Sequence, residues 1–171
     1  DALFVGRINE AKGIYDLLSV VELVKKKIPR FQLAIMGLGD QATMQKYLVK
    51  IKQLGLTRNI VFLGFKVGQE KYDIIKSCKL FLFLSKTESV PVAPMEAICT
   101  GKFTLTYDLD AYNMYKNNEI IKFKQGDIAS VAKTVLEILK RGKYSNENGK
   151  LLLKKYNWES IASIEYKQIS S

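Results

Sequence analysis

The chain has 171 residues, of which 47% are hydrophobic and 26% charged, and its formal net charge is +10. This is the balance of a globular domain, and no apolar run approaches the roughly 20 residues that a membrane span requires. The sequence contains no histidine, which excludes a Ser-His-Asp triad, a Cys-His dyad or a histidine-based zinc site within these residues.

Short apolar segments rich in β-forming residues alternate with longer amphipathic segments. The predicted strands are Leu3–Val5, Phe31–Met36, Ile60–Leu63, Leu80–Leu84, Phe103–Thr106 and Ile120–Phe123. The predicted helices are, approximately, Gly13–Lys27, Gln41–Leu54, Gln69–Ser77, Pro94–Cys99, Ala111–Lys116, Ile128–Lys140, Asn146–Lys155 and Trp158–Ile169. This alternation predicts an α/β fold: a Rossmann-like, doubly wound parallel sheet of about six strands flanked by helices, in one domain over residues 1–171.

Two cations follow the first predicted strand. Gly6 and Arg7 leave the strand, and Lys12 follows on the loop before a helix that begins near Ile14. Both cations should therefore lie at the carboxyl edge of the sheet, where ligands bind in open α/β folds. An arginine fork combined with a lysine point charge suits a diphosphate.

The second predicted strand runs into the turn Gly37-Leu-Gly39-Asp40. This turn lacks the third glycine of a dinucleotide fingerprint and follows the second strand, so it is weak evidence for an NAD site. We expect a tight strand-to-helix turn in which the small size of Gly37 and Gly39 leaves room for a ligand.

The most informative segment follows the fourth predicted strand and carries Glu88 and Glu96, which are separated by seven residues. Glu88 should lie on the loop at the strand's end, and Glu96 on the next helix, which we expect to open at Pro94, a first-turn position that proline tolerates. Taken singly, a loop glutamate is usually solvated, and an early-helix glutamate usually complements the helix dipole. Their position at the same sheet edge as Arg7 and Lys12 favours a binding site.

Together these motifs resemble the donor-binding domain of retaining glycosyltransferases, and more narrowly the C-terminal half of a GT-B fold enzyme of glycosyltransferase family 4. The resemblance runs from Asp1 to about Ile169. It is carried by Gly6-Arg7, Lys12-Gly13, the Glu88 and Glu96 pair, Gly101, Gly37-Leu-Gly39, Phe62-Leu-Gly64, Gly126-Asp127 and Tyr156-Asn-Trp-Glu159.

The resemblance implies a role for each site residue. Arg7 and Lys12 would hold the diphosphate of a nucleoside-diphosphate sugar and stabilise the leaving group. Glu88 would hydrogen-bond the transferred sugar, which makes Glu88, Arg7 and Lys12 the catalytic set, and Glu96 would take the ribose hydroxyls. The donor-binding set is completed by Gly6, Gly37 and Gly39, by amides around Val92 and Ala93 that face phosphate or sugar oxygens, and by Phe65 and Lys66 beside the base.

The implied activity is transfer of a hexose-type sugar, with retention at the anomeric carbon, to a glycan or lipid-linked acceptor in polysaccharide biosynthesis. No metal or cofactor is expected, because Asp and Glu do not cluster as a hard-metal cage requires. The chain begins almost inside its first strand, so we expect a fragment that lacks the acceptor-binding half of the family. Such a fragment should bind the donor without transferring sugar efficiently.

The sequence departs from the common family pattern at two places near this site. Pro91 stands where many relatives have glycine, and Gly101-Lys-Phe-Thr104 replaces a Gly-x-Pro step. Pro91 and Pro94 each remove a backbone donor, which bears on the amides that reach the donor sugar.

The two cysteines, Cys78 and Cys99, fall in predicted helical segments next to apolar strands. We expect buried thiols in a reducing compartment rather than a disulfide framework, and hence a cytoplasmic location. Peripheral contact with the inner membrane face stays open.

The positive charge leaves three explanations open. They are a lysine-rich composition with solvated helix faces, attraction to an anionic membrane surface, and binding to nucleic acid. No helix-turn-helix, zinc knuckle or aromatic RNA-binding signature is present, so nucleic acid ranks last and is not expected as a partner. Two other hypotheses remain: a donor subunit that works with a separate acceptor-binding protein, and a non-catalytic basic Rossmann-like module that binds nucleic acid or anionic lipid.

Overall fold

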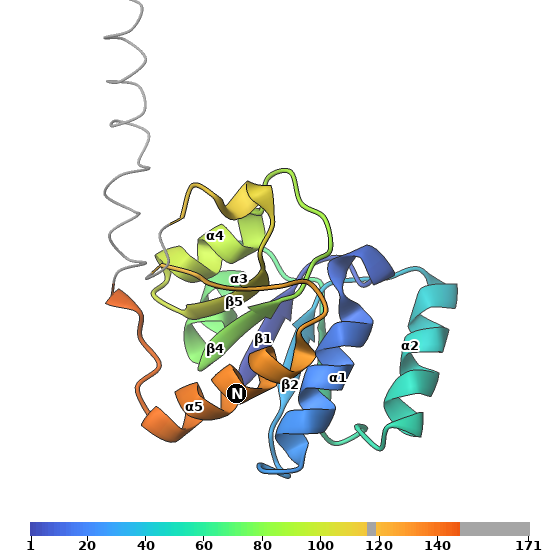
Figure 1. The fold of residues 1–171 in the computed structure, drawn as a ribbon. Helices are drawn as coiled ribbons and strands as arrows, with labels where there is room; N and C mark the ends of the chain where they lie inside the picture. The colour runs from blue at the N-terminus through green and yellow to red at the C-terminus, as the bar shows by residue number, and fades with distance from the viewer. Residues whose placement is uncertain (116–118, 148–171) are drawn as a thin grey trace, which may run out of the picture.

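The computed structural model describes residues 1–115 and 119–147, which form a six-stranded sheet with helices on both faces (Figure 1). The strands are β1 (Ala2–Val5), β2 (Leu33–Met36), β3 (Ile60–Gly64), β4 (Leu80–Phe83), β5 (Phe103–Tyr107) and β6 (Ile121–Phe123). The α-helices are α1 (Ile14–Lys25), α2 (Gln41–Gln53), α3 (Gly68–Ser77), α4 (Val92–Cys99) and α5 (Ile128–Arg141), and two short 3₁₀ helices are η1 (Glu10–Lys12) and η2 (Asp110–Tyr112). The predicted α/β fold is confirmed.

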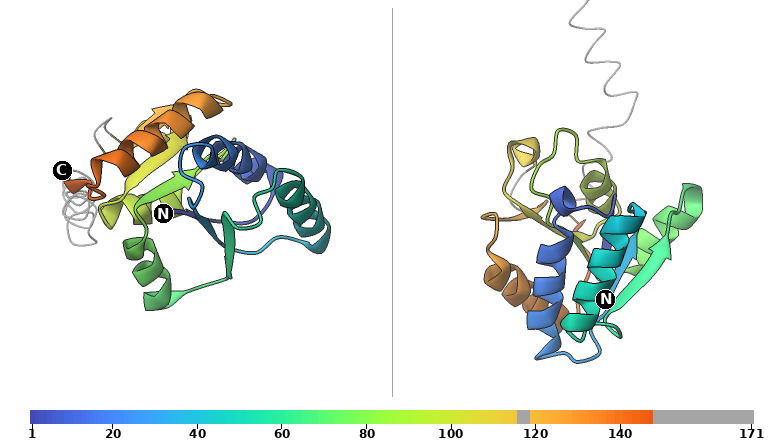
Figure 2. Two further views of the ribbon diagram at one scale, coloured as in Figure 1. Left: turned by 90° about the horizontal axis from the view of Figure 1, so that it is seen from below. Right: turned by 90° about the vertical axis from the view of Figure 1, so that its right-hand side faces the viewer.

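The sheet has the order β3-β2-β1-β4-β5-β6, and every neighbouring pair is parallel. Helices α1, α2 and α5 cover one face, while α3 and α4 cover the other (Figure 2). The direction of winding reverses between β1 and β4, which makes the carboxyl end of this pair the topological switch point of the sheet.

The core is densest around the two central strands. Every residue of β1 and of β4 is buried, as expected for parallel strands covered on both faces. The rings of Phe4 and Phe83 stack across the pair with centroids 5.6 Å apart. On one face α1 packs against α5 and brings Leu17 and Leu18 into the core.

Two segments near the site differ from the prediction. Helix α4 begins at Val92, two positions before the expected start, so Pro94 is its third residue and still lies in the first turn. The segment Glu10–Lys12, expected as loop, forms η1, because the Asn9 side chain caps it by accepting a hydrogen bond from the Lys12 amide over 3.0 Å. Capping of this kind satisfies donors at a helix start.

Other predictions fall partly or wholly beyond the described residues. Of the predicted helix Ala111–Lys116 only η2 forms, and Lys116 lies outside the described residues. The predicted helix Trp158–Ile169, Tyr156–Glu159, and all of the predicted helix Asn146–Lys155 except its first two residues also lie outside them. In the part of the chain that is described, no helix combines the length and apolar character needed to cross a bilayer.

The cysteines are free but less buried than predicted. Both Cys78 and Cys99 are half-buried, because each lies where a helix ends at the margin of the core. Burial raises the pKa of the Cys78 thiol to about 11 and also raises the pKa of Cys99, where the nearby charge of Glu96 adds to the effect.

Candidate functional site

The loops that leave β1 and β4 are held together at the switch point. The Lys86 amide donates to the Ala11 carbonyl over 2.8 Å. The Ser85 hydroxyl bonds the same carbonyl over 3.2 Å. Between the loops, Gly13 has a φ of 70°, and a Cβ there would lie 1.8 Å from the Leu84 carbonyl oxygen. Only glycine permits this approach, and it places the residues after β1 directly against those after β4.

Lys12 and Glu88 form an ion pair across these two loops. Their side chains are 27% and 7% exposed, and the ammonium also lies 5.7 Å from the centroid of the Phe83 ring. A lysine ammonium has three donors, so Lys12 can hold Glu88 and still bind an anion. A partly buried pair is screened less by salt than a surface pair.

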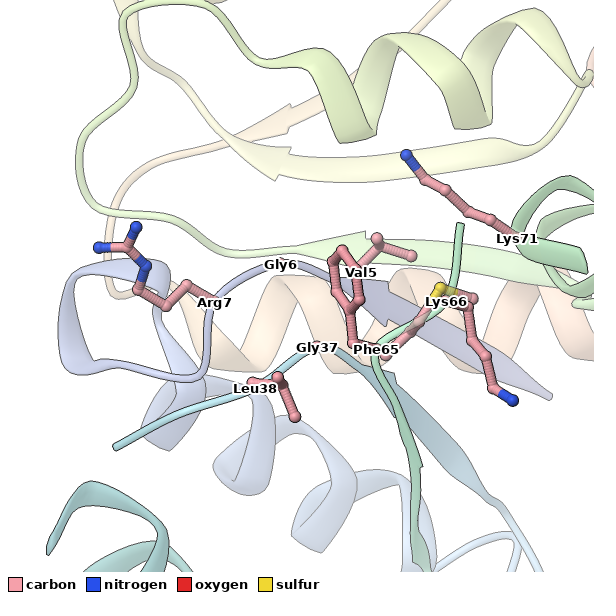
Figure 3. A pocket seen from close by; sticks show the side chains of 9 residues that line it. Val5, Gly6, Arg7, Gly37, Leu38, Phe65, Lys66 and Lys71 are labelled. Carbon is pink, nitrogen blue, oxygen red and sulfur yellow. The ribbon is translucent and has the colours of Figure 1, made fainter. Parts of the chain in front are cut away.

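The ends of β1, β2 and β3 border a cavity of 410 Å³ (Figure 3). Its lining residues are Val5, Gly6, Arg7, Met36, Gly37, Leu38, Phe65, Lys66 and Lys71. Three of them are cations and none is acidic, while Phe65 is 67% exposed at the rim. Such a cavity suits an anionic ligand that also carries a flat, stackable group.

The glycine turn after β2 packs closely against the loop after β1. Gly37 adopts a φ of 152°, and a Cβ there would lie 1.9 Å from the Gly6 carbonyl oxygen. At Gly39 a Cβ would lie 2.7 Å from the Ile8 carbonyl oxygen. The space that the glycines leave is therefore filled by the loop after β1, although Gly37 also lines the cavity. The role of Gly37 and Gly39 in leaving room for a ligand stays a prediction.

Arg7 lines the cavity, but its guanidinium extends away from Phe65 and Lys71 (Figure 3). The side chain is exposed, and among residues 1–115 and 119–147 no hydrogen bond or ion pair involves it. The structure thus brings Lys12 and Glu88 together, while the Arg7 fork remains available at the margin of the cavity.

Glu96 on α4 is held by two residues of α3. The Lys71 ammonium lies 2.6 Å from each carboxylate oxygen, and the Tyr72 hydroxyl is 3.3 Å from Oε1. Lys71 is not among the site residues predicted from the sequence. The sequence feature that indicates it is a lysine near the N-terminus of a predicted helix. The helix dipole disfavours a cation there, so such a lysine suggests an acidic partner.

Of the remaining predicted groups, some are already engaged in contacts within the chain and one is free within the residues that the structure describes. The Val92 amide donates to the Val90 carbonyl over 3.0 Å and is therefore occupied, in contrast to its expected role. The Ala93 amide has no acceptor among the described residues and remains available. Lys66 lines the cavity and pairs with Glu70 over 2.7 Å.

Tyr112 of η2 also lies near the site and is not among the residues predicted from the sequence. The side chain is fully buried, and its hydroxyl has no hydrogen-bond partner in the described part of the chain. Burial raises the pKa of this phenol, and the charge of Glu88 raises it further, so the hydroxyl stays protonated beside that carboxylate.

The geometry offers cations, amides and carboxylates at one sheet edge. Within residues 1–115 and 119–147, no group of three or more Cys, Asp and Glu side chains is placed to hold a metal ion. What these groups can do is bind a polyanion and stabilise negative charge that develops on it.

Comparison with known proteins identifies the family of this chain. The sequence model of the family described as "Glycosyl transferases group 1" matches residues 1–162. An uncharacterized glycosyltransferase of Methanocaldococcus jannaschii is 29% identical over 172 residues, which cover 94% of this chain and 42% of that protein. The capsular polysaccharide biosynthesis glycosyltransferase CapH of Staphylococcus aureus is 30% identical over 96 residues, which cover 56% of this chain and 26% of CapH.

Among solved structures, Anabaena HepE in complex with UDP superposes with a TM-score of 0.86 at 16% identity. The match covers 99% of this chain and 48% of HepE. It shows that the two share a fold. The chain spans less than half the length of each of these three proteins.

Proposed function

The chain belongs to the glycosyl transferases of group 1, and from that premise we propose that it is the donor-binding domain of a retaining glycosyltransferase. The donor is a nucleoside-diphosphate sugar of the hexose type, and the acceptor is a glycan or a lipid-linked sugar. The narrower assignment to glycosyltransferase family 4 is part of this proposal.

The observation that carries the proposal is the Lys12–Glu88 ion pair at the switch point, where Lys12 belongs to the segment after β1 whose first residues, Gly6 and Arg7, line a cavity with three cations. Ligands of open α/β sheets bind at this position. HepE, which has the same fold, was solved in complex with UDP, and this supports a nucleoside diphosphate as the ligand. The cations match its charge, and the exposed Phe65 ring matches its base.

The mechanism follows from the charge that develops when the sugar leaves the diphosphate. Lys12 and Arg7 stabilise the departing phosphate oxygens, at about 1.5–3 kcal/mol for each charge-assisted hydrogen bond. Glu88 orients Lys12 and accepts a hydrogen bond from the transferred sugar. Glu96 accepts hydrogen bonds from the ribose hydroxyls, and Phe65 and Lys66 lie beside the base.

Calorimetry of UDP, GDP and ADP binding to the chain tests the proposal. We expect selective binding of one nucleotide, weakened by about 10-fold or more in Lys12→Ala and Glu96→Ala. Lys133→Ala, which removes an exposed lysine of α5, is the charge-matched control and should bind as the wild type does. Absence of binding at millimolar nucleotide would contradict the proposal.

A second binding experiment distinguishes the donor site from the competing hypothesis of a non-catalytic basic module. Binding of nucleic acid or anionic vesicles that falls steeply with salt and ignores Glu96→Ala would favour that module over a donor site. A donor subunit that needs a separate acceptor-binding protein would instead bind nucleotide normally and gain transferase activity only when that protein is added.

A further inference from the structure

The carboxylate that we assign to the ribose is already engaged by a cation from another helix. Lys71 of α3 and Glu96 of α4 are 25 positions apart, and the Lys71 ammonium lies 2.6 Å from both carboxylate oxygens. Figure 3 shows the Lys71 side chain extending from α3 toward α4 at the border of the cavity. The contact therefore links the cavity to Glu96, which does not itself line it.

This pair differs from an ordinary surface salt bridge in three respects. The two side chains are only 21% and 14% exposed, so solvent screens them weakly. The ammonium also lies 5.8 Å from the centroid of the Tyr72 ring, whose hydroxyl is 3.3 Å from the same carboxylate. Finally, Lys71 occupies the first turn of α3, where the helix dipole disfavours a cation.

The proposed ligand explains why a cation beside Glu96 is useful. A carboxylate next to a diphosphate repels it, and a mobile carboxylate pays conformational entropy when it accepts two ribose hydroxyls. An ammonium that donates to Oε1 and lies 2.6 Å from Oε2 offsets the repulsion and fixes the plane of the carboxylate. Oε1 already accepts from Lys71 and Tyr72, whereas the buried Oε2 has no hydrogen-bond partner among the described residues and so keeps its capacity to accept a hydroxyl.

We propose that Lys71 is a positioning residue that fixes Glu96 and thereby sets the site's preference for a nucleotide with intact ribose hydroxyls. The inference rests on the proposed function of Glu96. It differs from a general electrostatic role because a cation acting only on the diphosphate would favour every nucleoside diphosphate equally.

The test compares UDP with 2′,3′-dideoxy-UDP, or the corresponding pair for GDP or ADP if the chain selects that base. By calorimetry, Lys71→Met should lower affinity for the intact nucleotide about 10-fold and change affinity for the dideoxy form less than about threefold. Lys71→Arg, whose planar fork also suits a carboxylate, should restore the preference for the intact ribose.

Two matched variants control for the loss of a positive charge from the cavity and from helix α3. Lys66→Met removes a cation from the same cavity whose partner is Glu70, so it should weaken both ligands to the same extent. Lys76→Met removes an exposed lysine from the same helix and should change neither. In a Glu96→Gln background, Lys71→Met should no longer alter the ratio of the two affinities, because the residue acts through Glu96.

The outcomes distinguish this inference from the proposed function. If the wild type prefers the intact nucleotide and Lys71→Met keeps that preference, the role of Lys71 is refuted while the donor site stands. If the wild type binds neither ligand, both proposals fail. Should Lys71→Met not fold, Glu96→Gln alone must still abolish the preference for intact ribose, and a retained preference would overturn the inference.

Discussion

Lys12 and Glu88 are 76 positions apart in the sequence and form an ion pair at the point where the sheet reverses its winding. The pair exists because β1 and β4 are neighbours, with Ala2 aligned to Leu80 and Leu3 to Phe81. Each strand then delivers its following loop to the same place. The two loops are joined further by the bonds that the Ser85 hydroxyl and the Lys86 amide donate to the Ala11 carbonyl.

The energetics of this pair can be measured by a double-mutant cycle. Lys12→Met should destabilise the fold by about 1–3 kcal/mol, because the Glu88 side chain, only 7% exposed, loses its cation. Adding Glu88→Gln should recover part of that loss in urea unfolding, since the uncompensated charge is then gone. Strictly additive effects of the two substitutions would show that the side chains are not coupled.

The turn after β2 should be intolerant of any side chain. Gly37→Ala is expected to cost about 2–4 kcal/mol, because its Cβ would lie 1.9 Å from the Gly6 carbonyl oxygen at a φ of 152°. Gly68→Ala is the matched control: its φ is 59° and a Cβ meets nothing within 4 Å, so only backbone strain of about 1–2 kcal/mol remains. Thermal unfolding of both variants tests this, and equal losses would contradict it.

Asn59 should contribute to stability through two hydrogen bonds at the start of β3. Its side chain is 2% exposed and donates to the Pro29 carbonyl over 3.1 Å and to the Phe31 carbonyl over 2.7 Å. Asn59→Ala leaves the carbonyl of the buried Phe31 and the carbonyl of the exposed Pro29 with one partner fewer, at a cost of about 1–3 kcal/mol in urea unfolding. The exposed Asn113→Ala should cost less than about 0.5 kcal/mol.

The reactivity of Cys78 should depend on pH well above the range of an ordinary thiol. Burial disfavours the thiolate and raises the pKa to about 11, so the reactive form keeps increasing beyond pH 9. In a Cys99→Ala variant, labelling by a thiol reagent should accelerate about 10-fold per pH unit from pH 8 to pH 10. The urea-unfolded chain is the control and should level off near pH 9, as an unperturbed thiol does. A plateau at the same pH in the folded chain would show that burial does not shift this group.

The sequence by itself determined most of the elements and the type of fold. Leu80–Phe83 is apolar without interruption and β4 forms there, while the amphipathic segment after Gly13 forms α1. These features are local, because an apolar run or a helical period is written in consecutive residues. For the same reason the sequence alone showed that Lys12 and Glu88 follow strands. The family resemblance then predicted that both bind the same donor molecule.

Only the tertiary structure decided which of these residues meet. The strand order that places β1 beside β4, the Gly6 carbonyl packed against Gly37, and the contact between Lys71 and Glu96 all join segments that are distant in the chain. Such contacts depend on how helices and strands pack around a common core, and no run of neighbouring residues encodes them. Helix η1 combines both kinds of contact, because its Asn9 cap is local while its Ala11 carbonyl accepts bonds from Ser85 and Lys86 after β4.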